Sequence, residues 1–210
     1  MATTTTSRRL TGVLALDSTA FRAVAEDEGA LDGALVTVVG ATLLAGIGGL
    51  LWTQWGGHPP ANATFEIDLR RFIARSVLLG TIVQIGAWLL WVGVTFLYLR
   101  AFGERVRGAR LARVMGYAFA PMGVQLFIAP PGMEIAAAAV AFGYTAAAMI
   151  IGVEAATDAA RGRVALSVLV GLALFAVVLG LLGNGTSDLA PGIFALDPLP
   201  TSVGILPLRP

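Results

Sequence analysis

The sequence predicts an all-α protein, a polytopic bundle of about five transmembrane helices preceded by a short amphipathic N-terminal helix. The first observation is the composition, since 57% of the 210 residues are hydrophobic and only 13% are charged, with a mean hydropathy of +0.81. Soluble domains carry about 25% charged residues, so this chain has too few polar groups to cover a surface in water. The second observation is that five long uncharged stretches follow one another, each bounded by charged residues.

Residues 1–33 are the most polar part of the chain and are expected to form an N-terminal arm. Asp17 or Ser18 can cap a short helix in which Phe21 and Val24 share one face, while the acidic residues 26–28 point elsewhere. An apolar face beside arginines is typical of a helix that lies on the membrane surface. A solvated arm is the alternative interpretation.

The five uncharged stretches are predicted to be helical because no water inside the bilayer could satisfy the backbone of open strands. The third is the shortest; Pro121 predicts a kink in it and Pro130-Pro131 ends it, so it either crosses fully or enters as a tilted or re-entrant segment. The expected spans are residues 34–55, 76–99, 114–129, 135–153 and 164–182.

The distribution of arginine predicts the orientation, because basic residues stay on the cytoplasmic side. With the N-terminus inside, ten of the 14 arginines lie inside: Arg8, Arg9, Arg22, Arg100, Arg105, Arg107, Arg110, Arg113, Arg161 and Arg163. The other four lie outside: Arg70, Arg71, Arg75 and Arg209. This bias favours a cytoplasmic N-terminus and an external C-terminus.

The tail, residues 183–210, is rich in proline and apolar side chains. Prolines this close exclude a spanning helix, and the apolar content is too high for an ordinary disordered tail. We expect an extended strap on the outer side, packed on its own bundle, on the bilayer face or on a partner protein.

Several kinds of chemistry are excluded by residue types that the chain lacks. All 14 basic residues are arginine, cysteine is absent, and the single histidine, His58, is expected to be an ordinary surface residue. A P-loop and a pyridoxal Schiff base both need lysine, and thiolate metal sites need cysteine. We therefore expect no catalytic, cofactor-binding or metal-binding residues, no cofactor and no nucleic-acid partner.

The loop before the third span carries the densest positive charge. A group of arginines at a membrane exit attracts anionic lipid headgroups at about 1 kcal/mol per residue. The alternative is that these arginines only fix the topology. The candidate headgroup ligands are Arg105, Arg107, Arg110 and Arg113.

Small residues recur at a spacing of four on the predicted helices, a pattern that lets helix backbones approach closely in lipid. Such rows serve packing within one chain or contact with a second copy. The rows are Ala41, Ala45 and Gly49 on the first span, Ala139, Gly143 and Ala147 on the fourth, and Ala176 and Gly180 on the fifth.

Polar side chains inside the spans are few, and no charged residue lies near a helix centre. Proton relays and ion-coupled pumps need such charges. Gln84 and Gln125 could pair between the second and third spans, or line a pathway beside the kink at Pro121.

The third span opens with Gly116-Tyr117 and has Pro121 four residues after the tyrosine, which resembles the Yip1-domain family. The segment from Phe21 to Asp27 resembles the amphipathic entry of that family, without its usual proline, and the likeness covers about residues 10–182. The resemblance implies five spans and a cytoplasmic N-terminus. Eukaryotic members act in vesicle trafficking with Rab-type GTPases; this chain looks like the prokaryotic type, to which that role is not carried over.

Taken together, the sequence predicts a non-enzymatic membrane scaffold or accessory subunit of a prokaryotic cell membrane. Its expected partners are anionic lipids and a partner membrane protein or a second copy. A small transporter or permease component near Gln84, Gln125 and Pro121 is the alternative. A membrane enzyme is disfavoured because Glu134 and Glu154 lie at opposite ends of one helix, about 30 Å apart at helical rise.

Overall fold

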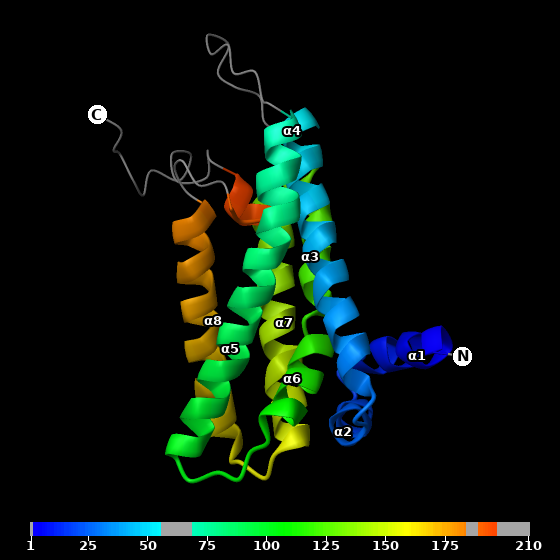
Figure 1. Ribbon diagram of the computed structural model, residues 1–210, viewed down its shortest axis with the longest axis vertical. Coiled ribbons are helices and arrows are strands. Elements are labelled where there is room, and N and C mark those ends of the chain that lie inside the picture. The colour runs from blue at the N-terminus through cyan, green and yellow to red at the C-terminus, as the bar shows by residue number, and fades with distance from the viewer. Residues whose placement is uncertain (1, 56–68, 184–188, 197–210) are drawn as a thin grey trace.

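The computed structural model describes residues 2–55, 69–183 and 189–196 (Figure 1). Within these ranges the chain forms helices and no strands, which confirms the all-α class. His58 and the tail at residues 184–188 and 197–210 lie outside the described residues.

Five helical segments are long and apolar enough to cross a membrane, as predicted. They are Ala30–Trp52, Ile73–Ala101, Gly108–Ile128, Glu134–Ala156 and Arg161–Gly183. They run side by side and alternate in direction, so the start of α3 (Ala30–Trp55) and the end of α8 (Arg161–Gly183) lie at opposite ends of the bundle (Figure 1). The arm lies near one end, which we call the arm end.

Two pieces of helix make up the second span, and a third short helix leads into it. The short α4 (Leu69–Phe72) leads into a π-helical segment, η1 (Ile73–Leu79), and then into α5 (Gly80–Ala101). Trp91 of α5 donates its Nε1 hydrogen to the carbonyl of Val168 at 2.9 Å, and its ring lies 5.2 Å from that of Phe175. These contacts join α5 to α8 along the buried side of both helices.

The third span changes its helix type at the predicted kink. Residues Gly108–Tyr117 form α6, and Ala120–Ile128 form a 3-10 helix, η2, with Pro121 in its first turn. Proline has no N–H to donate to the residue four positions earlier, so the α-helical pattern stops before Pro121. The helix also begins six residues earlier than position 114, which places Arg110 and Arg113 on α6.

The third span is the centre of the bundle, because 72% of its most apolar window is buried against at most 50% in the other four. It packs between α3 and α7 (Glu134–Ala156). A Cβ on Gly48 of α3 would lie 2.2 Å from the carbonyl oxygen of Gln125, so the two backbones touch. At the end opposite the arm, Trp52 Nε1 donates to Glu134 Oε1 at 2.8 Å and joins α3 to α7.

The described part of the tail packs on its own bundle. A short 3-10 helix, η3 (Gly192–Ala195), lies against α3 and η2, and the Ile193 N–H donates to Gln125 Oε1 at 3.0 Å. The ring of Phe194 meets that of Phe142 edge-on, with centroids 5.8 Å apart. Of the three expected surfaces for the strap, residues 189–196 therefore use their own bundle.

The predicted rows of small residues behave differently on different helices. Ala41, Ala45 and Gly49 are buried under η2 and η3. On α7, by contrast, Ala139 and Gly143 are exposed, and a Cβ on Gly143 would meet nothing within 4 Å. Ala147, the third residue of this row, is half-buried, so the row lies mostly on an outer face of α7.

Candidate functional site

The N-terminal arm is a pair of helices fixed to the arm end of the bundle. The first, α1 (Ala2–Leu14), lies crosswise to the long helices, and α2 (Ser18–Glu26) follows it (Figure 1). Asp17 caps α2, since its Oδ1 accepts from the backbone N–H of Thr19 at 2.8 Å and from the Thr19 hydroxyl at 2.7 Å. These two hydrogen bonds lower the pKa of the Asp17 carboxyl.

The apolar face of the amphipathic helix α2 packs against other helices of the protein. Phe21, Val24 and Ala25 are buried. The Phe21 ring lies on Gly152 of α7, where an added Cβ would be 2.9 Å from two ring atoms. The apolar face that the sequence indicated for the membrane surface is thus buried against α6 and α7.

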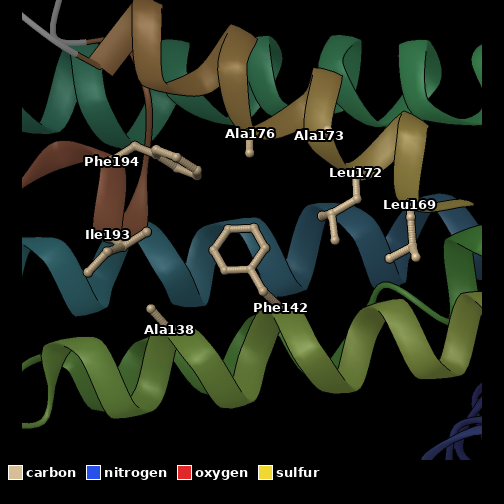
Figure 2. Close-up of a pocket in the computed structure, with 8 residues that line it drawn as sticks. All are labelled: Ala138, Phe142, Leu169, Leu172, Ala173, Ala176, Ile193 and Phe194. Carbon is tan, nitrogen blue, oxygen red and sulfur yellow. The ribbon is translucent and has the colours of Figure 1, made fainter.

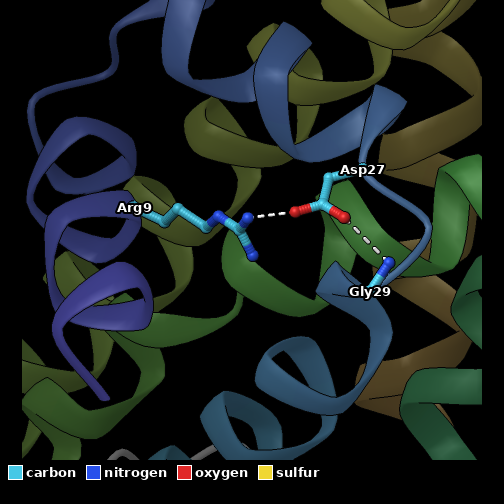
Figure 3. Close-up of polar contacts among 3 residues, drawn as sticks. All are labelled: Arg9, Asp27 and Gly29. Carbon is cyan, nitrogen blue, oxygen red and sulfur yellow. Dashed lines mark hydrogen bonds and ion pairs between the residues drawn. The ribbon is translucent and has the colours of Figure 1, made fainter. Parts of the chain in front are cut away.

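An ion pair ties the two ends of the arm together. The guanidinium of Arg9 in α1 contacts the carboxylate of Asp27, whose Oδ1 also accepts from the Gly29 N–H at 2.8 Å (Figure 3). Partial burial would lower the pKa of Arg9, but the hydroxyl of Tyr117 and the carboxylate of Asp27 outweigh it and raise that pKa. Asp27 therefore links α1 to the turn that begins α3.

The predicted Gly116, Tyr117 and Pro121 motif lies where the arm, α3 and the third span meet. A Cβ on Gly116 would lie 2.6 Å from the Ala34 Cβ, so α6 and α3 cross without room for a side chain. Tyr117 and Pro121 are both buried. Each residue of the motif thus has a structural role: close helix crossing, a buried ring beside the arm, and the change to 3-10 helix.

The four predicted arginines line one cavity at the arm end. Arg105, Arg107, Arg110 and Arg113 share its walls with Glu26, Glu28, Ala25 and Ala156, and its volume is about 390 Å³. We call this cavity the arginine cavity. Four arginines and two glutamates line it, so the lining carries a net positive charge.

Arg113 occupies the deepest position among these arginines. It is only 8% exposed, and its Nε donates to the carbonyl of Ala109 at 3.1 Å. Its Nη1 is buried and has no hydrogen-bond partner. The nearest contact between opposite charges in the cavity joins Arg110 Nη2 to Glu26 Oε1 at 4.0 Å.

Other arginines at the arm end are paired. Arg163 Nη1 lies 2.7 Å from Glu104 Oε1, and Arg161 Nε lies 3.2 Å from Glu154 Oε1. Both pairs hold the start of α8 to neighbouring segments. The sequence analysis used Arg161 and Arg163 only to predict the orientation, and the structure places both in ion pairs rather than among the residues that line the arginine cavity.

A second, apolar cavity lies between α7, α8 and η3 (Figure 2). Its volume is about 440 Å³, and it has no polar side chain to orient a reacting molecule. It is lined by Ala138, Phe142, Leu169, Leu172, Ala173, Ala176, Ile193 and Phe194.

The two predicted glutamines do not pair with each other. Both are buried, but Gln125 uses its Oε1 to hold Ile193 and its Nε2 to contact Met122 Sδ at 3.5 Å. Neither Gln84 nor Gln125 lines the arginine cavity or the apolar cavity. Gln125 accepts a hydrogen bond from the tail. No local sequence pattern could indicate this contact.

Groups of His, Cys, Asp and Glu that could hold a metal ion are absent from the part of the chain that the structure describes. The close contacts at Gly48, Gly152 and Gly171, which sequence reasoning missed, are sites of helix packing. Each of these glycines packs against a bulky side chain or the backbone of another helix. The contacting residue is distant in sequence, so the sequence around the glycine does not reveal the contact.

Comparison with protein families gives a match over most of the chain. The sequence model of the Yip1 domain matches residues 11–182, which is most of the chain and contains Gly116, Tyr117 and Pro121. No curated protein and no solved structure matches.

Proposed function

This chain belongs to the Yip1 domain family, and from that premise we propose that it is a non-enzymatic scaffold that holds a partner membrane protein at the arm end of the bundle. The five spans make it an integral, multi-pass membrane protein. We place it in a prokaryotic cell membrane, with the arm end in the cytoplasm, because ten arginines gather on that side.

One observation carries the proposal: the arm is packed against the bundle. Phe21 is fully buried on Gly152, and Arg9 and Asp27 join the arm's two ends. An arm packed in this way presents a preformed polar outer surface, which lowers the ordering cost of binding. The exposed residues of this surface include Arg8, Thr11 and Arg22.

The described cavities support binding rather than catalysis. The apolar cavity has no group that could act as an acid, a base or a nucleophile, and the arginine cavity offers only permanent positive charges and two carboxylates. No observation favours the transport alternative, because Gln125 is engaged by the tail and neither glutamine lines a described cavity.

Co-purification from native membranes in mild detergent tests the proposal. We expect membrane proteins in stoichiometric amounts with the wild type and with R100Q, and their loss with the double variant R9Q/F21A, which frees the arm. R100Q is the control because Arg100 is exposed in the last turn of α5, outside the arm surface, and its substitution removes the same charge. Recovery of the same proteins with R9Q/F21A would refute a role for the fixed arm, and recovery of this chain alone, as a dimer, would identify a second copy as the partner.

A further inference from the structure

The arginine cavity contains a buried positive group with an unused hydrogen-bond donor. Arg113 is 8% exposed, and its Nη1 has no partner among the described residues. Burying a guanidinium N–H without an acceptor is unfavourable, because the group loses water and gains nothing in return. An acceptor that enters the cavity would remove this cost.

The charges around Arg113 define the kind of acceptor. Arg105, Arg107 and Arg110 line the same cavity, and only Glu26 and Glu28 oppose them. Glu26 is 4.0 Å from Arg110, and among the described residues no carboxylate forms an ion pair with Arg105, Arg107 or Arg113. The N-terminus of α6 begins directly after Arg107 and adds a further partial positive charge. This setting suits a phosphate group, which guanidinium groups bind through several oxygens at once.

The position of the cavity indicates where the phosphate comes from. Its walls include Ala156, the last residue of α7, and Arg107, the residue before α6, so it lies at the level where two spans end. This is the level of lipid headgroups. A volume of about 390 Å³ leaves room for a whole headgroup around its phosphate, since a water takes up about 30 Å³.

We propose that the arginine cavity binds the phosphate of an anionic phospholipid headgroup, with Arg113 as its buried donor. Arg105, Arg107 and Arg110 hold the outer oxygens. Glu26 and Glu28 accept from headgroup hydroxyls, as in phosphatidylglycerol. This site is separate from the outer surface of the arm, so it goes beyond the scaffold role and does not depend on it.

Spin-labelled lipids test this proposal on the whole protein in phosphatidylcholine vesicles. The preference for labelled phosphatidylglycerol over labelled phosphatidylcholine is measured at about 1 M salt, where the Debye length is about 3 Å and surface attraction is screened. We expect the preference to fall about fivefold further in R113Q than in R22Q. Arg22 is the matched control because it is exposed and does not line the cavity.

The double variant R105Q/R107Q provides a second test in case R113Q does not fold. Arg105 and Arg107 are both exposed, so their substitution should not affect folding. It should also lower the preference, with an unchanged melting temperature. Equal preferences in R113Q, R105Q/R107Q and R22Q would overturn the proposal. A second result would also overturn it: inorganic phosphate raises the melting temperature of the wild type but not of R113Q, while the wild type shows no lipid preference. The natural ligand would then be a soluble phosphate compound. Co-purification of partner proteins is recorded in parallel and tests the scaffold role alone.

Discussion

Trp91 of α5 lies on Gly171 of α8, so closely that a Cβ at residue 171 would come within 2.2 Å of an indole carbon. The same indole donates to the carbonyl of Val168, one turn earlier. The contact between α5 and α8 is therefore fixed both by shape and by a hydrogen bond inside the bundle.

The substitution G171A should lower the stability of the bundle by about 1–3 kcal/mol, because the new methyl group overpacks the Trp91 site. Thermal unfolding in detergent, followed by circular dichroism, measures the effect. G180A on the same helix is the control, since a Cβ there would meet nothing within 4 Å. Equal melting temperatures for the two variants would show that α5 and α8 do not pack as described.

The substitution R9Q should loosen the arm without unfolding the bundle. Arg9 and Asp27 are partly exposed, with side chains 22% and 40% accessible, so their pair contributes at most about 1 kcal/mol. We expect faster hydrogen exchange in residues 7–27 and unchanged exchange in α7. R8Q should behave as the wild type, because Arg8 is exposed. Identical exchange in R8Q and R9Q would show that the ion pair between Arg9 and Asp27 does not hold the arm in place.

The cap of α2 should depend on pH through Asp17. Its pKa is lowered by hydrogen bonds from Thr19, so the cap contributes stability above the pKa of the unfolded state, about 3.9, and loses it as the pH falls through the lower folded value. Carbon-13 NMR of the carboxyl group should therefore give a midpoint below that of a model aspartate. In T19V, which lacks the side-chain donor, the midpoint should rise. A midpoint unaffected by T19V would mean that the hydroxyl does not set it.

The absence of cysteine allows a direct test of orientation. Single cysteines in E28C and Q54C lie at opposite ends of the bundle, beside the arm and at the end of α3. A membrane-impermeant maleimide added to intact cells should label Q54C, and should label E28C only after lysis, because arginine gathers at the arm end. The reverse pattern would place the N-terminus outside.

Much of the fold could be predicted because its signals are local. The central part of each span is an uncharged run, and Gly116, Tyr117 and Pro121 lie within six positions of one another in the sequence. The four arginines of the cavity also lie within one short stretch. Their grouping with Glu26 and Glu28 could not be foreseen, because it depends on how α2 docks.

The contacts that hold the elements together could not be predicted from the sequence. Arg9 and Asp27 are 18 residues apart on separate elements, and Gln125 reaches Ile193 across 68 residues. Small residues occur on several faces of each helix, so their spacing alone did not distinguish the buried row at Ala41 from the exposed row at Gly143. Only the docking of whole helices selects between them.

The change of helix type at Pro121 alters how far the third span reaches. A 3-10 helix rises about 2.0 Å per residue against about 1.5 Å for an α-helix, so the ten residues of α6 and the nine of η2 together extend about 33 Å. The hydrocarbon core of a bilayer is about 30 Å thick. The tighter winding of η2 thus adds about 0.5 Å for each of its nine residues, and the start of α6 at Gly108 supplies the rest of the length that residues 114–129 lack.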